Sequence, residues 1–442
     1  MPENKQPMQP EALPPESPEG AKSAVGFGEA LRFWVKLGFI NFGGPAGQIS
    51  IMHRELVEEK RWVSEGQFLR ALNFCMLLPG PEAMQLAAFA GWRLQGLAGG
   101  LIAGGLFILP GALVIFALAF VYSAVIDMEW VQALFLGVKA TVVVIVIEAI
   151  LRVARRALRR PAHWVLAGLS FIALFLFAVP FPLVVVAAGL WGAVTAPTAP
   201  AELAPPSRFR WPILLATLAT GLVLWWSPVA LAALAGQSFL TDLGLFFSKL
   251  AVVTFGGAYA VLGYMAQEVV SAYRWVSTPQ LMDALGLAET TPGPLILVTV
   301  FVSIVAGLNQ GSTGLALLGG LMTLWVTFVP CFLWIFAGAP LVDWIAGRPR
   351  LQAALSAITA AVVGVILNLS VWFALHVLFG EVRDIEAGPL TTVLPVWTTL
   401  QPVALALSLV AAWLLLVRHA SMLLTLAAMA ALAGLLHLLG LL

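Results

Sequence analysis

Long apolar runs restrict the fold of this chain more than any other feature of its sequence. They recur along its length, and a run of about 20 apolar residues is long enough to cross the hydrocarbon core of a bilayer as a helix. In lipid, backbone polar groups must be satisfied within the protein, which favours helices for such segments. We therefore expect an all-α polytopic membrane protein with roughly 10–13 membrane segments by the length criterion.

Composition and motifs argue against several functional classes. Only 10% of the 442 residues are charged and the formal net charge is +1, so no broad attraction to nucleic acid is indicated. The sequence contains no HExxH, GxSxG, CxxC or P-loop pattern, which argues against hydrolase chemistry and nucleotide-driven pumping. Cys75 and Cys331 lie in apolar surroundings and are interpreted as buried thiols. We expect a protein that is not an enzyme and uses no cofactor or metal.

An internal repeat divides the chain. Aligning each residue n with residue n+213 matches 36–81 to 249–294 without a gap, with 18 identities in 46 pairs. The matched motifs are FGG at 42–44 and 255–257, RWVS at 61–64 and 274–277, and PGP at 79–81 and 292–294. After a short insertion the offset becomes 220, and Pro110 then matches Pro330. Shared apolar composition does not explain aligned RWVS and PGP motifs, so we interpret the two halves as copies of one unit.

The charged loops predict opposite orientations for the two copies. Cytoplasmic loops are rich in Lys and Arg. This places RVARRALRR (152–160) in the cytoplasm and DMEW (127–130) on the opposite side of the bilayer. In the second copy RPR (348–350) replaces DMEW, and EVRDIE (381–386) replaces the arginine cluster. The predicted fold is therefore two inverted-topology repeats. In many secondary transporters such repeats place broken or re-entrant helices at a substrate site near the midplane.

The same patterns predict the organisation of the chain. The N-terminal residues are polar and proline-rich, which is typical of a disordered tail. The predicted units are a disordered tail (1–24), a first transporter repeat (25–160), a linker with about three membrane segments (161–237), a second, inverted repeat (238–386) and a C-terminal helix pair (387–442). Because Arg418 and His419 mark a cytoplasmic turn, we expect a periplasmic C-terminus and a cytoplasmic N-terminus.

Two matched pairs of breaks interrupt the apolar runs. A helix N-terminus leaves backbone N–H groups unpaired, and these groups can hold an oxyanion without a charged side chain. We predict that the breaks form a substrate site. Its expected residues are Asn41, Gly43, Gly44, Pro45, Gln48, Pro79, Gly80, Pro81, Gln85, Thr254, Gly256, Gly257, Thr290, Thr291, Pro292, Gly293 and Pro294. The alternative interpretation is that Gly and Pro only kink packed helices.

Ionisable residues near these breaks are candidates for gating or coupling, because a charge inside a bilayer is costly unless it faces a polar cavity or reaches the surface. The candidates are Lys36, Lys139, Lys249, Glu82, Glu289, Arg61 and Arg274. Lys139 lies near the middle of its span and is the best candidate for an intramembrane counter-charge. The alternatives are snorkelling of the two matched lysines, interfacial anchoring of the two arginines and a helix-dipole contact for Glu82. Glu148 is expected to pair with Arg152 on a helix surface.

The break motifs also carry a family resemblance. The stretch FGGPAGQISIMHRELVEEKRWVSEGQFLRALNFCMLLPGPEAMQLAAFAGW resembles the chromate ion transporter family, as do its second-half echoes FGGAYAVLGYM, RWVS and TTPGP. The resemblance covers about residues 26–442 and is to the long form with two oppositely oriented halves. It marks Gly43, Gly44, Pro45, Gln48, Pro79, Gly80, Pro81 and Gln85 as shared positions. The second copy departs from the motif at Ala258 and Val261.

This resemblance implies export of chromate from the bacterial cytoplasm through the inner membrane, with sulfate recognised as an analogue. Helix N-termini suit a tetrahedral dianion. We predict a secondary transporter that is driven by the membrane potential, by proton exchange or by both, and that confers chromate resistance. The alternatives are uptake of sulfate or another oxyanion, and a non-transporting membrane scaffold. The expected partners are the anion, the lipid bilayer and, as one possibility, a second copy in a homodimer.

Overall fold

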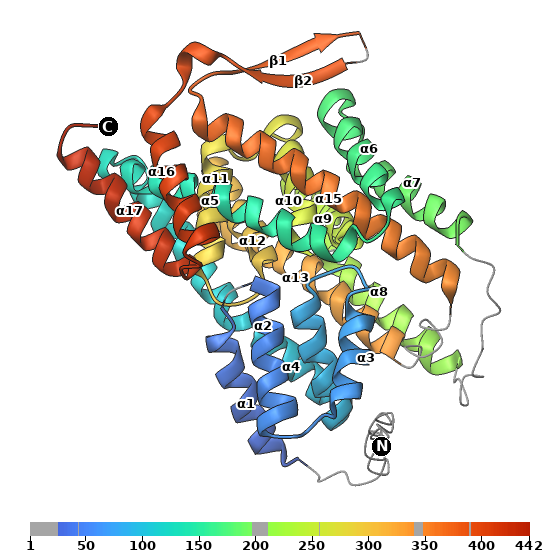
Figure 1. The fold of residues 1–442 in the computed structure, drawn as a ribbon. Coiled ribbons are helices and arrows are strands. Elements are labelled where there is room, and N and C mark those ends of the chain that lie inside the picture. The colour runs from blue at the N-terminus through green and yellow to red at the C-terminus, as the bar shows by residue number, and fades with distance from the viewer. Residues whose placement is uncertain (1–24, 43, 197–210, 256, 340–347, 389) are drawn as a thin grey trace, which may run out of the picture.

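The computed structural model describes residues 25–42, 44–196, 211–255, 257–339, 348–388 and 390–442. Over these residues the chain is almost entirely helical, as Figure 1 shows, which confirms the predicted all-α architecture. The predicted tail (1–24) and two of the predicted site residues, Gly43 and Gly256, lie outside the described residues.

The first copy begins with short helices and ends with long ones. Its elements are α1 (Phe27–Ile40), α2 (Gly44–His53), the π-helical turn η1 (Arg54–Glu59), α3 (Glu65–Cys75), α4 (Glu82–Val125) and α5 (Glu129–Ala157). Helix α4 is interrupted at Gln95 and Gly96, where Gly96 has a φ of 66°. A Cβ atom at Gly91 would lie 2.4 Å from the carbonyl oxygen of Gly99. Because the backbones touch on both sides of the interruption, α4 is a tight hairpin of two helices.

The second copy repeats this order. Its elements are α9 (Ser238–Val253), α10 (Ala258–Ala266), η2 (Gln267–Ala272), α11 (Thr278–Thr290), η3 (Leu295–Leu297), α12 (Val298–Asn309), α13 (Thr313–Gly338) and α15 (Pro349–Leu378). Helices α12 and α13 pack against each other and correspond to the two halves of α4.

The RWVS motif produces the same turn twice. Arg61 and Arg274 each follow a π-helical turn and adopt left-handed backbone conformations, with φ angles of 50° and 53°. Ser64 and Ser277 each form a capping box with the glutamine three residues later. A capping box satisfies backbone N–H groups that the helix leaves unpaired. The equivalent local geometry follows directly from the repeated sequence.

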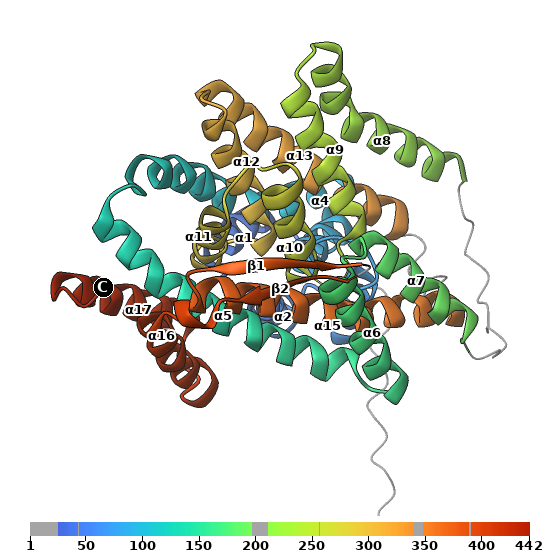
Figure 2. The same cartoon turned by 90° about the horizontal axis from the view of Figure 1, so that it is seen from above.

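The remaining elements surround the two copies. They are α6 (Pro161–Phe177), α7 (Phe181–Val194), α8 (Trp211–Leu234), the strands β1 (Val382–Ala387) and β2 (Leu390–Pro395), the turn η5 (Trp397–Thr399), α16 (Pro402–Ala412), η6 (Trp413–Val417) and α17 (Met422–Leu438). Helices α6 and α7 pack on α15, and α16 and α17 pack on α5. The antiparallel β1–β2 hairpin lies across the end of the molecule opposite α1 and α3, as Figures 1 and 2 show.

Length and composition identify the helices that fit a bilayer. Among the described residues, α4, α5, α8, α13 and α15 are long and apolar enough to cross it, and five shorter apolar helices accompany them. The chain is thus a multi-pass membrane protein. The breaks follow α1 and α3 in the first copy and α9 and α11 in the second, whereas α2 and α10 continue directly into η1 and η2.

Candidate functional site

The four breaks meet in two pairs, and each pair joins the two copies. The backbone N–H of Gly80 donates to the carbonyl of Thr254 at 2.8 Å, and that of Gly293 donates to the carbonyl of Asn41 at 3.3 Å. Gly80 is equivalent to Gly293 in the repeat, and Asn41 is equivalent to Thr254. The contacts are therefore reciprocal, since the PGP turn of each copy binds the FGG break of the other. Reciprocal contacts of this kind are the mark of a two-fold relationship.

Buried side-chain amides add hydrogen bonds to the pair of breaks that joins Asn41 to Gly293. The Gln48 Nε2 atom donates to the carbonyls of Asn41 at 2.9 Å and Gly293 at 2.7 Å. The side chain of Asn41 donates to the carbonyl of Phe107 at 3.1 Å. In the second copy Val261 takes the place of Gln48 and is fully buried. The two copies therefore differ chemically at this position of the breaks.

Two amide oxygens at the breaks are buried without a hydrogen-bond donor among the described residues. They are Oδ1 of Asn41 and Oε1 of Gln85, whose Nε2 atom donates to the carbonyl of Pro79 at 2.8 Å. A buried acceptor without a donor costs about 1–3 kcal/mol. The breaks therefore hold polar groups whose bonding the described protein atoms do not complete.

The threonines predicted at the second-copy breaks bond locally. The hydroxyls of Thr254, Thr290 and Thr291 donate to backbone carbonyls three or four residues earlier in their own helices. Each hydroxyl oxygen keeps its capacity to accept a further bond. The main structural role of these side chains is thus to donate hydrogen bonds to backbone carbonyls at the C-terminal ends of α9 and α11.

Helical segments begin directly after the breaks, at α2, α4, α10 and η3. Pro45 is the second residue of α2, and Pro81 is the N-cap of α4. Proline suits the first turn because its missing N–H has no partner there. Gly257 is the N-cap of α10, and a Cβ atom built on it would lie 3.8 and 3.9 Å from the carboxylate oxygens of Glu82. The first residue of α4 therefore points an acidic group at the start of α10, where a negative charge is favoured.

A cavity of about 280 Å³ opens beside the start of α2. It is lined by Gly44, Pro45, Ile145, Glu148, Ala149, Arg152, Tyr259, Glu289, Leu415, His419, Ala420 and Met422. These residues come from α2 and α5 of the first copy, from α10 and α11 of the second, and from η6, the turn after it and the start of α17. The cavity thus brings together residues next to breaks of both copies.

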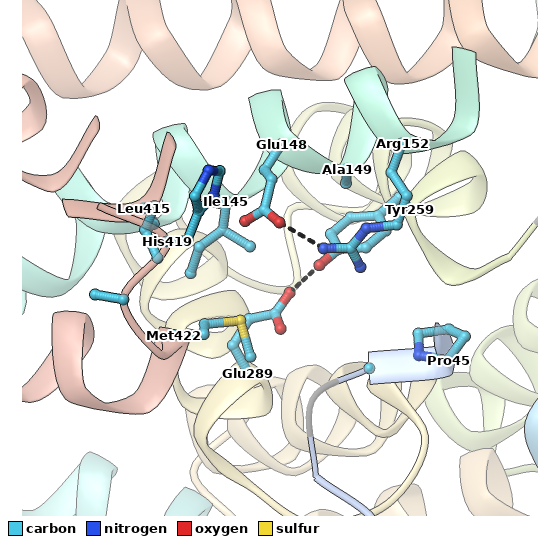
Figure 3. Close-up of a pocket in the computed structure, with 12 residues that line it drawn as sticks. Pro45, Ile145, Glu148, Ala149, Arg152, Tyr259, Glu289, Leu415, His419 and Met422 are labelled. Carbon is cyan, nitrogen blue, oxygen red and sulfur yellow. Dashed lines mark hydrogen bonds and ion pairs between the residues drawn. The ribbon is translucent and has the colours of Figure 1, made fainter. Parts of the chain in front are cut away.

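Ionisable side chains of both signs face this cavity, as Figure 3 shows. The guanidinium of Arg152 donates to Glu148 Oε1 at 2.6 Å, which confirms the predicted helix-surface pair. The Tyr259 hydroxyl donates to the carboxylate of Glu289, and Pro45 lies across the cavity from Arg152. A guanidinium next to a helix N-terminus can hold an oxyanion, and carboxyl groups can exchange protons. Of the residues that line the cavity, Gly44 and Pro45 are predicted substrate-site residues and Glu289 is a predicted coupling candidate.

Tyr259 and His419 were missed as site residues. Tyr259 follows the second FGG break and replaces Ala46 of the first copy, and this difference between the copies was a usable signal. The sequence predicts His419 only as part of a cytoplasmic turn with Arg418. Its approach to the cavity depends on the packing of α16 and α17 against α5, which local sequence does not reveal.

The matched lysines lie away from the cavity and have different partners. Lys36 pairs with Glu55 at 2.6 Å, and its side chain is 56% exposed whereas that of Glu55 is 4% exposed. The ammonium of Lys249 lies over the ring of Tyr264, 5.1 Å from its centroid. The two RWVS arginines are exposed in their turns, and neither lines the cavity. The structure therefore does not bring these four charges together.

Lys139, the predicted intramembrane counter-charge, has a buried acidic partner. Its ammonium lies 3.2 Å from Oδ1 of Asp283, and the Tyr122 hydroxyl donates to Oδ2 of the same carboxylate at 2.9 Å. Asp283 is not among the residues predicted from the sequence. The available signal was an acidic residue in the apolar stretch LMDALGLA, at the position where the first copy has Arg70.

Comparison with known proteins places these features in a family. The sequence profile described as chromate transporter matches residues 28–193 and 241–435. The chain is 31% identical over 363 residues to the chromate transport protein of Pseudomonas aeruginosa, covering 80% of this chain and 81% of that protein. It is 29% identical over 346 residues to the chromate transport protein of Cupriavidus metallidurans, covering 76% of this chain and 80% of that protein.

A third relative, from Synechococcus elongatus, is a probable chromate transport protein that is 27% identical over 339 residues, which cover 76% of this chain and 82% of that protein. No solved structure matches the chain. Because the family profile covers most of both copies, the chain belongs to the chromate transporter family.

Proposed function

We propose that this protein is a secondary transporter that exports chromate from the bacterial cytoplasm and so confers chromate resistance. Family membership and the names of the relatives support chromate as the substrate. The observation that carries the proposal is the cavity where the start of α2 from one copy and Tyr259 of α10 from the other meet the guanidinium of Arg152. The protein is proposed to act in the inner membrane, with a cytoplasmic N-terminus and a periplasmic C-terminus.

The cavity suits a tetrahedral dianion by its chemistry and its size. In this proposal the backbone at Gly44 and the side chain of Arg152 hold the anion, because helix N-termini and guanidinium groups favour oxyanions. The remaining break residues shape the site, and Gly43 and Gly256 are proposed to take part from outside the described residues. The volume of about 280 Å³ compares with roughly 30 Å³ for one water in the liquid. It has room for an anion of four oxygens with part of its hydration shell.

The proposed transport mechanism is alternating access by two inverted copies. The reciprocal hydrogen bonds from Gly80 to Thr254 and from Gly293 to Asn41 support a two-fold relationship between the copies. In transporters with inverted repeats, one repeat rocks against the other around a central site. In this mechanism the contacts between PGP turns and FGG breaks act as the hinges about which the copies move.

The membrane potential provides a driving force for this direction. Moving a charge through the bilayer is worth about 2.3 kcal/mol per 100 mV. With an inside-negative potential, outward movement of a dianion is favoured for both of its charges. Proton exchange can add to this driving force through carboxyl groups such as Glu289 at the cavity.

The test is chromate uptake into everted membrane vesicles that contain the protein, under an imposed inside-positive potential. We expect uptake above that of protein-free vesicles. The double variant Glu148→Gln and Arg152→Gln should lower it by about tenfold, because a charged hydrogen bond contributes about 1.5–3 kcal/mol. The matched control is the double variant Glu381→Gln and Arg383→Gln, which neutralises the exposed 2.8 Å pair on the β hairpin. Equal uptake with and without the protein would refute chromate export, and preferential sulfate uptake into right-side-out vesicles would favour the alternative.

A further inference from the structure

Three polar side chains from both copies form a buried cluster away from the cavity. Lys139 comes from α5 and Tyr122 from α4 in the first copy, and Asp283 comes from α11 in the second. The carboxylate of Asp283 lies 3.2 Å from the Lys139 ammonium and accepts a 2.9 Å hydrogen bond from Tyr122. Asp283 is 1% exposed and Tyr122 is 3% exposed, whereas the Lys139 side chain is 20% exposed. The carboxylate is thus enclosed by protein, and its cationic partner is partly accessible.

We propose that Asp283 is a proton-binding site whose ion pair with Lys139 couples proton movement to transport. This inference rests on the proposed transport function. The proton is taken from water onto a carboxylate oxygen of Asp283 and is later returned to water, so one O–H bond forms and breaks and no oxidation state changes. Protonation removes the attraction to Lys139 and leaves its ammonium without a counter-charge.

A structural role alone accounts poorly for this pair. Replacing a buried ion pair by apolar residues is often neutral or stabilising, because the desolvation of two charges offsets their attraction. Ionisable residues inside membrane proteins mark ion pathways and proton relays. The pair is also absent from the equivalent positions, where Thr359 replaces Lys139 and Arg70 replaces Asp283. An ion pair that served only to stabilise the fold shared by the two copies would be expected in both copies.

The surroundings of Asp283 offer few other ionisable groups. Helix α11 packs against α5, α4, α12, η3 and α17. In the described chain, α12 and η3 have no ionisable side chain, and α17 has His437 near its far end. The other ionisable residues of α5 are at least nine positions from Lys139, and on α11 itself Glu289 is six positions from Asp283. On α4, Glu82 and Arg93 are at least 29 positions from Tyr122, and Asp127 lies in the exposed turn five residues after it. Lys139 is therefore the charged partner that decides the state of this carboxylate.

Helix α11 connects the pair to the breaks. Asp283 and Glu289 lie six positions apart on one helix, or about 9 Å at 1.5 Å per residue. The helix then leads into the PGP turn, where Gly293 bonds to Asn41 of the other copy. A shift of α11 caused by the loss of the ion pair would thus reach both the cavity and the contact between copies.

Helices α11, α5 and α17 pack closely next to the pair, and glycines lie at both contacts. A Cβ atom at Gly286 of α11 would lie 2.2 Å from Cγ1 of Val138, the neighbour of Lys139. On its other side, a Cβ atom at Gly137 would lie 2.1 Å from the carbonyl oxygen of Met429. Helix α5 is therefore held closely between α11 and α17 at the level of the pair. A change of charge there acts where the Val138 side chain packs on the α11 backbone and where the backbones of α5 and α17 touch.

The experiment uses the full-length protein in liposomes and compares the wild type with Asp283→Asn. Two activities are measured, namely chromate accumulation driven by a pH gradient with the potential clamped, and chromate exchange at equal pH. We expect Asp283→Asn to lose gradient-driven accumulation by at least about tenfold while exchange stays within about twofold; tenfold corresponds to about 1.4 kcal/mol. The control Glu381→Gln, in the exposed hairpin pair, should retain both activities.

A second measurement does not depend on transport. Infrared difference spectra of the purified protein between acidic and alkaline buffer should contain a carboxylic-acid band that Asp283→Asn abolishes. The double variant Asp283→Asn and Lys139→Gln, which leaves no unpaired buried charge, replaces the single variant if the latter does not fold. Retained gradient-driven accumulation in either variant, or an unchanged infrared band, would overturn the proposal. A wild type that moves no chromate would instead refute the transport function, while the infrared result would still decide the proton site.

Discussion

At the residue scale, the glycines of the PGP turns are positions where no other residue fits without strain. Gly80 has a φ of 124°, a conformation that side chains with a Cβ rarely adopt. A Cβ atom there would lie 2.8 Å from the Cys331 sulfur and 2.9 Å from Gln85 Nε2. The N–H of Gly80 also makes the contact with Thr254 of the other copy. Gly80 therefore allows the backbone of the turn, leaves room for the buried Gln85 side chain and makes the hydrogen bond between the two copies.

We predict that Gly80→Ala lowers both stability and transport. Backbone strain of this kind costs about 1–3 kcal/mol, and the clash with Cys331 adds to it. Thermal unfolding in detergent and vesicle uptake of chromate measure the two effects. The matched control is Gly105→Ala, because Gly105 lies inside α4 with no atom within 4 Å of a built Cβ and without a positive φ. If the two variants behave alike, the PGP conformation is not a constraint.

At the element scale, the capping boxes define where α3 and α11 begin. Ser64 and Ser277 each accept a hydrogen bond from the backbone N–H of the glutamine three residues later. The same motif also places the left-handed arginine three residues before each serine. Because these interactions are local, the repeated sequence predicts them without knowledge of the tertiary fold.

Removing either cap should destabilise its own helix. We expect Ser64→Ala and Ser277→Ala each to cost about 1 kcal/mol, and hydrogen exchange of the α3 or α11 amides should increase accordingly. Ser238→Ala is the control, because Ser238 is exposed at the start of α9, where no side-chain cap is formed. Unchanged exchange in both helices would show that packing, rather than the cap, determines where they begin.

At the scale of the whole molecule, the proposed inversion predicts opposite sides of the membrane for equivalent residues. Glu59 and Ala272 are equivalent in the repeat, and both are exposed at the ends of π-helical turns. We expect a membrane-impermeant thiol reagent to label Glu59→Cys and Ala272→Cys from opposite sides. The native Cys75 and Cys331 are buried and should give little background. Labelling of both positions from the same side would mean that the copies are parallel.

The sequence by itself determined the features that depend on neighbouring residues. Apolar length predicted the membrane helices, and the repeat predicted matching turns and caps. The glycines and prolines predicted where helices stop and restart, and the spacing of Glu148 and Arg152 predicted their ion pair. Each of these follows from the period of a helix or the backbone limits of one residue type.

Only the tertiary structure decided which breaks touch and which side chains share a cavity. The repeat pairs Asn41 with its equivalent Thr254, whereas in space Asn41 contacts Gly293. In the same way Lys139 found its partner Asp283 in the other copy. The physical reason is that repeat spacing reports equivalence between positions, whereas contact between copies joins non-equivalent positions through the packing of many apolar side chains.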